Sequence, residues 1–203
     1  MNIISIDTSS KFCSLSIQLS SNIRDSIISN LALSHSSELA VNLKKLINKY
    51  QIKISDLDFV LVNVGPGSFT GLRIGVSFAK GLCLSNNIPL IPINSFDMID
   101  SKVNCNEKIF YYGIYSHKNF IYGKKYNKNM RPSKPQLISL EEEVDYPIYV
   151  FGLDKSDNYN DNIMHVSFDP YDLIDVFINV NKKKRNHDLN SINPIYIDYN
   201  DTA

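Results

Sequence analysis

Apolar and polar residues alternate along the first thirty positions in a pattern that predicts β-strands. An apolar run covers residues 2–7, an alternating segment covers 12–19, and a third candidate strand covers 24–30. The polar residues 8–11 separate the first two segments as a hairpin turn. Three consecutive strands at this spacing predict an antiparallel meander.

After residue 35 the apolar residues recur at helical spacing, and helices then alternate with strands. The pattern predicts a helix at 36–50, a continuous apolar strand at 58–64 and a glycine-rich turn at 65–71. A second helix at 72–85, a strand at 89–93 and a short helix at 95–99, capped by Ser95, follow. A meander followed by β–α alternation predicts an α/β fold with a mixed sheet and helices on its faces. This element order is characteristic of the actin-like (ribonuclease-H-like, ASKHA) fold.

The second half of the chain shows a weaker pattern. Strands are predicted at 108–115, 120–126, 147–151 and 164–168, and a helix begins at Asp169-Pro170. Actin-like proteins carry a duplicated second domain, but only about 100 residues remain for it here. We therefore expect an N-terminal lobe at 1–104 and a reduced second lobe at 105–203.

Composition narrows the classes of function. The 203 residues hold 21 Lys+Arg and 21 Asp+Glu, and this zero net charge argues against a general nucleic-acid or membrane binder. Three widely spaced cysteines indicate a reduced cytoplasmic chain. The start of the chain does not resemble a signal peptide, and no apolar run is long enough to span a membrane.

The glycine-rich stretch GPGSFTGLRIG at 65–75 holds four of the eight glycines. Such a turn between a strand and a helix can bind phosphate through backbone N–H groups. However, its spacing fits neither GxGxxG nor the P-loop pattern, and Pro66 removes a donor. The spacing therefore favours a structural turn over phosphate binding, formed by Gly65, Pro66, Gly67, Ser68, Phe69 and Thr70.

No catalytic, nucleotide, cofactor or metal site is predicted. Asp7 follows the first strand, where actin-like enzymes hold Mg–phosphate, but the turn after it lacks glycine. No two of the four histidines stand four residues apart, so no helix presents a pair of imidazoles to a metal. No GxSxG nucleophile motif occurs.

The helix at 72–85 is apolar almost all round, which is typical of a helix that is fully buried or faces a partner. Gly71, Gly75 and Ala79 recur every four residues and predict a smooth groove that another helix can approach closely. Together with the helix at 36–50 it predicts a protein–protein surface. The expected interface residues are Leu39, Leu43, Leu46, Gly71, Arg73, Gly75, Val76, Phe78, Ala79, Lys80 and Leu82.

Two basic patches remain. Residues 118–134 hold six basic side chains and no acid, interleaved with aromatic residues, and Lys182–Arg185 forms a second run. Basic and aromatic side chains together suit an RNA-contacting surface. A solvated, lysine-rich hairpin explains the same pattern.

Three segments, IISIDTSS at 3–10, SHSSELA at 34–40 and VGPGSFTGLRIGVSFAKGL at 64–82, resemble the TsaB (YeaZ-type) family. The resemblance implies an actin-like fold and a non-catalytic role in forming N6-threonylcarbamoyladenosine in tRNA. It also implies pairing with the catalytic subunit TsaD through the helices at 36–50 and 72–85. The pair would recruit the ATPase TsaE, and tRNA would be contacted only through the complex.

Other functions remain open from the residues alone. The chain could act by itself as an ATP-using transferase or a peptidase of the same fold, or as a tRNA-binding module using residues 118–134. When no partner is present, the two apolar helices could also pair with a second copy of the chain.

Overall fold

The computed structural model describes residues 1–20, 22–30, 35–102, 108–127, 130–141, 145–153, 161–179 and 188–197, apart from the side chains of residues 30, 35 and 36. The chain forms two compact units. Unit 1 consists of Met1–Ser101 and Asp169–Ile195, and unit 2 of Lys102–Phe168 and Tyr196–Ala203. The described helices include none that is long and apolar enough to cross a membrane.

Unit 1 contains a five-stranded mixed sheet in the order β3-β2-β1-β4-β5. Strands β1, β2 and β3 form the predicted antiparallel meander, whereas β4 and β5 run parallel to β1. The strands are β1 (Ile3–Asp7), β2 (Phe12–Leu19), β3 (Ile23–Asn30), β4 (Phe59–Gly65) and β5 (Leu90–Asn94).

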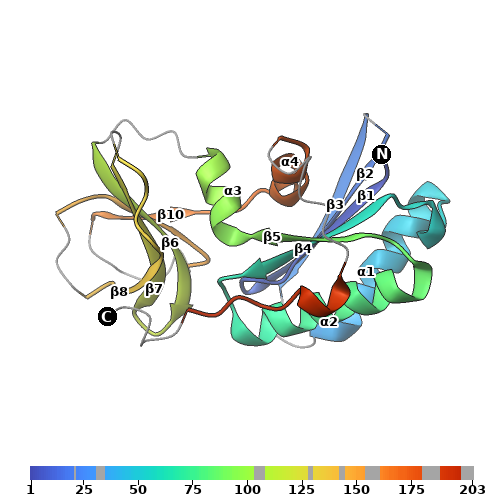
Figure 1. Cartoon of the computed structure of the whole chain (residues 1–203), viewed down its shortest axis with the longest axis horizontal. Coiled ribbons are helices and arrows are strands. Elements are labelled where there is room, and N and C mark those ends of the chain that lie inside the picture. Colours follow the sequence, from blue (N-terminus) through green and yellow to red (C-terminus); the bar gives the residue numbers. More distant parts are fainter. Residues whose placement is uncertain are drawn as a thin grey trace. The chain divides into compact units, whose positions relative to one another are not determined.

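Helices cover both faces of this sheet (Figure 1). Helices α1 (His35–Tyr50) and α2 (Phe69–Asn86) contact each other and pack on one face, with α1 over β2 and β3 and α2 over β1, β4 and β5. Their inward residues complete a core with Ile4, Leu15 and Val62, all fully buried. Helices α3 (Ser95–Lys102) and α4 (Asp172–Asn179) and the short 3-10 turns η1 (Ile54–Asp56) and η2 (Leu189–Ser191) complete the unit.

Helix α2 begins three residues before its predicted start, because Ser68 caps it. Ser68 Oγ accepts a hydrogen bond from the Gly71 N–H, and the helix ends at Asn87 in the left-handed conformation. The glycine-rich stretch is therefore partly the first turn of the helix.

Unit 2 repeats the strand connectivity of unit 1. Its sheet has the order β10-β9-β6-β7-β8; β6, β7 and β8 are antiparallel neighbours, whereas β9 and β10 run parallel to β6. The strands are β6 (Ile109–His117), β7 (Phe120–Asn127), β8 (Gln136–Ser139), β9 (Ile148–Phe151) and β10 (Ile163–Val166). In the described part of unit 2, no counterparts of α1 and α2 connect these strands. This is the duplicated, reduced second lobe expected from the sequence.

The division into units differs from the expected lobes 1–104 and 105–203. The first boundary lies close to the expected one, but α4 returns to unit 1 and contacts β1, β4 and β5. The Phe177 ring packs 5.0 Å from the Phe59 ring in the core. The helix returns because Leu173, Val176 and Phe177 form an apolar face. This face becomes buried against the side of the unit 1 sheet that α1 and α2 do not cover.

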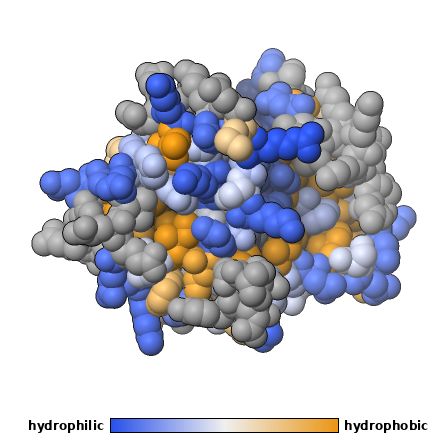
Figure 2. Space-filling view, turned by 60° about the vertical axis from the view of Figure 1, so that its left-hand side comes forward, coloured by the Kyte–Doolittle hydropathy of each residue, from blue (hydrophilic) through white to orange (hydrophobic). Residues whose placement is uncertain are grey.

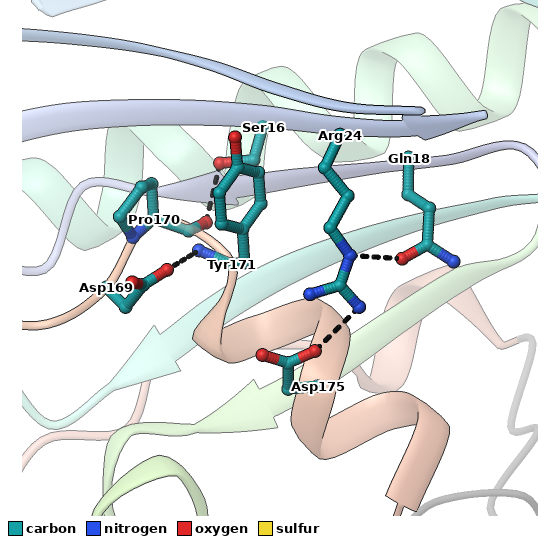
Figure 3. Close-up of polar contacts among 7 residues, drawn as sticks. All are labelled: Ser16, Gln18, Arg24, Asp169, Pro170, Tyr171 and Asp175. Carbon is teal, nitrogen blue, oxygen red and sulfur yellow. Dashed lines mark hydrogen bonds and ion pairs between the residues drawn. The ribbon is translucent and has the colours of Figure 1, made fainter. Parts of the chain in front are cut away.

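Polar contacts also hold α4 against the meander (Figure 3). Arg24 Nη2 lies 2.8 Å from Asp175 Oδ1, and Arg24 Nε donates to Gln18 Oε1. The Ser16 hydroxyl donates to the Pro170 carbonyl at 2.5 Å. The contacts therefore anchor both the start and the middle of α4.

Hydrophilic residues predominate on the face drawn in Figure 2, with hydrophobic residues between them. Large apolar side chains that are more than half exposed include Ile28, Phe69, Leu84 and Met130. Leu84 is the most exposed of them, at 75%.

Candidate functional site: the hairpin turn, the glycine loop and the outer helices

A buried polar network lies at the carboxyl ends of the parallel strands, and Asn63 of β4 is its centre. The Asn63 amide donates to Asp7 Oδ1 at 3.1 Å and to Ser9 Oγ at 3.0 Å. Asn63 Oδ1 accepts from the Gly65 N–H and lies 2.9 Å from Ser95 Oγ. Buried amides need such partners, so the network ties β1, β4 and the start of α3 together.

The hairpin turn after β1 packs directly on the glycine loop. The Ser68 N–H donates to the Ser9 carbonyl at 2.6 Å, and the Thr8 hydroxyl donates to the Gly71 carbonyl at 2.7 Å. A Cβ on Gly67 would lie 2.5 Å from the Ser9 oxygen, and one on Gly71 would overlap the Thr8 oxygen. These glycines are needed because only a residue without a side chain permits this approach.

Gly65 faces a different neighbour. Its φ is +103°, a conformation that favours glycine, and a Cβ would lie 2.8 Å from the Ile195 carbonyl oxygen. The Ile195 N–H in turn donates to the Val64 carbonyl at 2.6 Å. The segment after α4 is therefore bonded to the end of β4, beside the glycine loop.

Several backbone donors of the loop are used within the chain. The N–H groups of Gly65, Ser68, Gly71 and Leu72 bond to Asn63, Ser9 and Ser68 acceptors. Asp7 accepts from Asn63 and from the Ser9 N–H. A phosphate cradle needs several such donors pointing outwards, and this loop instead binds the hairpin turn.

The structure corrects the predicted outward groove of small residues. A Cβ on Gly75 would overlap the Thr8 hydroxyl, and Ala79 is fully buried in the core. The small residues of α2 thus contact the chain's own hairpin turn and sheet. Most of the predicted interface residues are likewise inside unit 1: Leu39, Leu43, Leu46, Gly71, Gly75, Val76 and Ala79.

The remaining predicted interface residues reach the surface of α2. Arg73 is exposed, and its guanidinium lies 3.8 Å from the centroid of the Phe69 ring. Phe78, Lys80 and Leu82 are half-buried. Phe78 and Leu82 pack against the core, whereas Arg73 and Lys80, seven residues apart, lie on another side of the helix. Contact of these residues with a partner remains a prediction.

Periodicity did not identify several residues that the structure places at these sites. Val41 of α1 and Leu84 of α2 are exposed apolar residues, at 50% and 75%. Asn63 and Ser95 form the polar network, and the one amide within the apolar segment DFVLVNV was the available signal for it.

Cys13 and Cys83 are free and buried. Burial raises the pKa of Cys13 to about 11 and that of Cys83 to about 12. Cys105 and the second basic run, 182–185, lie outside the described residues. Within the described residues, no group of three or more His, Cys, Asp or Glu side chains could hold a metal ion.

Comparison with protein-family models shows to which family the chain belongs. Residues 25–165 match the model of the family described as TsaD, tRNA N6-adenosine threonylcarbamoyltransferase. The chain belongs to this family. A TsaD-family enzyme from Thermosipho melanesiensis, named tRNA N6-adenosine threonylcarbamoyltransferase, is 45% identical over 60 residues, which cover 30% of this chain and 18% of the enzyme.

Longer matches are to proteins named tRNA threonylcarbamoyladenosine biosynthesis protein TsaB, which confirms the resemblance seen in the sequence. The protein from Bacillus subtilis is 28% identical over 167 residues, 77% of this chain and 72% of the relative. The one from Buchnera aphidicola subsp. Schizaphis graminum is 33% identical over 100 residues, 49% of this chain. The chain spans about half the length of two of these relatives, 47% of the Buchnera aphidicola subsp. Schizaphis graminum protein and 58% of the Buchnera aphidicola subsp. Acyrthosiphon pisum protein.

A solved structure of YeaZ from Pseudomonas aeruginosa has the same fold. It aligns with a TM-score of 0.73 at 16% identity, over 97% of this chain and 99% of that chain. A second Pseudomonas aeruginosa structure, described as similar to peptidase YEAZ, gives the same TM-score at 17% identity. The predicted actin-like α/β fold is confirmed.

Proposed function

We propose that this chain is a non-catalytic subunit in the formation of N6-threonylcarbamoyladenosine in tRNA. It pairs with a TsaD-type catalytic subunit and helps to recruit a TsaE-type ATPase. The membership of the TsaD family and the TsaB names of the longer-matching relatives support the pathway. The closed glycine loop supports the non-catalytic role, and it is the observation that carries this proposal.

In an actin-like enzyme the first hairpin and the loop after β4 need free donors for phosphate. Here the hairpin turn has no glycine, and Ser9 and Thr8 fill the approach to Gly67 and Gly71. Opening this site would break the bonds from Ser68 to Ser9 and from Thr8 to Gly71. We therefore expect titration calorimetry with ATP–Mg to give no binding heat, whereas saturable binding with turnover would favour the stand-alone enzyme.

The outer side of α1 and α2 is the proposed pairing surface. The two helices lie side by side over one face of the sheet. Their buried leucines fix them to the core, and Val41, Phe69 and Leu84 remain exposed outside it. Of these, Phe69 packs against the guanidinium of Arg73, a cation that could meet an acidic partner group.

The test is pairing with the cognate TsaD-type protein, measured by calorimetry. Leu84→Asp and Val41→Asp should each weaken pairing about tenfold or more and lower threonylcarbamoyladenosine formation in the reconstituted system. Ile28→Asp is the matched control, because Ile28 is 53% exposed on β3 and alternates there with Ile27, the residue that packs on the core. Unchanged pairing in both helix variants would contradict the proposed surface, and failure of the wild type to pair would contradict the proposed function.

The same surface is the one that two copies of the chain would use to pair when TsaD is absent. A chain that is dimeric alone should become monomeric with Leu84→Asp and stay dimeric with Ile28→Asp. Sedimentation of the three proteins distinguishes this arrangement from a dimer formed elsewhere.

A further inference from the structure

The proposed pairing surface leaves the basic stretch of unit 2 unused. Residues 116–135 hold Lys118, Lys124, Lys125, Lys128, Arg131 and Lys134 and no acidic residue, although the whole chain has zero net charge. Lys128 lies outside the described residues. Lys118, Arg131 and Lys134 are exposed. The excess of positive charge is therefore local and available to a polyanion.

The fold gathers part of this charge at one edge of β7. Residues 130–135 run back along the strand, starting with a bridge between Met130 and Asn127. The Ser133 N–H donates to the Lys125 carbonyl, and the Lys125 N–H donates to Ser133 Oγ, both at 2.9 Å. Lys134 directly follows Ser133 and Arg131 precedes it by two residues, so the bonds of Ser133 hold this stretch of backbone along Lys125.

Tyrosine rings lie next to this charge. Tyr111 of β6 is the register partner of Lys125, and the Lys125 ammonium lies 5.7 Å from the centroid of its ring. The same ammonium lies 5.2 Å from the centroid of the Tyr146 ring. Both rings are half-buried, so part of each is open to solvent. A lysine held between two tyrosines positions their rings on one face of the sheet.

The turn between β6 and β7 is not part of this group of tyrosines and cations. Glu141, the first acid after the basic stretch, accepts a hydrogen bond from the Asn119 amide there. We use the name β7 surface for the side chains of Tyr111, Lys125, Arg131, Lys134 and Tyr146.

We propose that the β7 surface binds RNA directly and contacts the tRNA substrate while the chain is part of the proposed complex. Exposed Arg131 and Lys134 would pair with phosphates, and unpaired bases would stack on Tyr111 and Tyr146. A combination of backbone cations and aromatic platforms is what single-stranded RNA requires of a protein. This inference rests on the proposed function for the identity of the RNA, but not for the chemistry of the surface.

The experiment measures binding of tRNA to the complex, and to the chain alone, at several salt concentrations. Arg131→Gln and Lys134→Gln should each weaken binding about fivefold near 0.15 M salt and reduce the salt slope by about 0.7, the loss of one phosphate contact to a single strand. Tyr146→Leu keeps an apolar side chain but removes the ring. It should weaken binding at least about fivefold with an unchanged slope.

Lys53→Gln is the matched control, because Lys53 is an exposed lysine of unit 1. The inference is overturned if Arg131→Gln and Lys134→Gln match Lys53→Gln in affinity and slope. It is also overturned if they weaken pairing with the TsaD-type subunit in the absence of tRNA, since the surface would then bind protein. Pairing of the wild type, measured without tRNA, tests the proposed function separately.

Discussion

Gly71 and Gly81 lie in the same helix, yet their surroundings differ completely. A Cβ at residue 71 would overlap the Thr8 carbonyl oxygen, whereas nothing lies within 4 Å of one at residue 81. Gly71→Ala should therefore lower the free energy of unfolding by about 1–3 kcal/mol through overpacking. Gly81→Ala should raise it by up to about 1 kcal/mol, because alanine favours helix. Urea unfolding measures both; equal effects at the two sites would contradict the hairpin contact.

A second single-residue effect depends on pH. The Lys49 ammonium, 2.6 Å away, and the Tyr50 hydroxyl hold the pKa of Asp25 below its ordinary value, so the folded state favours the carboxylate. The stabilisation is complete above the unfolded pKa of about 4 and is lost as the pH falls through the lower folded pKa.

We expect Asp25→Asn to lower the melting temperature at pH 6 by about 1–3 °C and to have a smaller effect at pH 3. Thermal unfolding across this range is the measurement, with Asp145→Asn, an exposed aspartate of unit 2, as the control. A difference that persists unchanged at pH 3 would rule out the carboxylate as its source.

The sequence could predict that glycines 65–71 are structural, but it could not identify what they touch. Thr8 and Ser9 are separated from Gly67 and Gly71 by some sixty positions, and only the parallel pairing of β1 with β4 brings them together. Asn63 is the one amide in an apolar strand, but its partners Asp7 and Ser95 lie 56 and 32 positions away in the sequence.

At the scale of elements, α2 shows where periodicity is insufficient. The pattern located the helix and its nearly continuous apolar surface, but a helix packed on a sheet, on α1 and on a hairpin turn has three apolar sides. Which side stays outside depends on those neighbours. Val76 and Leu43 proved to be core residues, at 3% and 6% exposure, so acidic substitutions there would disrupt folding rather than test pairing.

Helix α4 gives a prediction at the same scale. Phe177 is 4% exposed and packs on Phe59, so Phe177→Ala should cost about 3–5 kcal/mol of stability. Arg24→Ala removes a half-exposed ion pair with Asp175 (Figure 3) and should cost at most about 1 kcal/mol. Chemical denaturation compares the two; a larger loss in Arg24→Ala would mean that the polar contacts, not the apolar face, hold the helix.

At the scale of the whole molecule, the antiparallel meander and the mixed sheet of unit 1 followed from the element pattern, whereas the return of α4 did not. The residues after 168 read as a helix, but nothing local states which sheet an amphipathic helix covers. The sequence likewise did not predict β8 (Gln136–Ser139), a four-residue strand without a clear alternation.

The division into units predicts how local unfolding caused by a substitution spreads through the chain. Phe177→Ala should accelerate amide hydrogen exchange in β1 and β4, which α4 contacts, and leave β6 and β7 unchanged. Exchange followed by mass spectrometry resolves these strands. Acceleration in β6 and β7 comparable to that in β1 would show that the two units open together.

Unit 1 is assembled from two stretches of chain, and this fixes an order of events on the ribosome. Residues 1–101 leave the exit tunnel first, but the segment with α4 follows only after all of 102–168 has been made. Until then Phe59 and its sheet face lack their cover, while most of unit 2 can already fold from contiguous chain. The nascent protein can therefore fold most of its inserted unit before it completes the one it began with, and in that interval a chaperone has an apolar surface to bind.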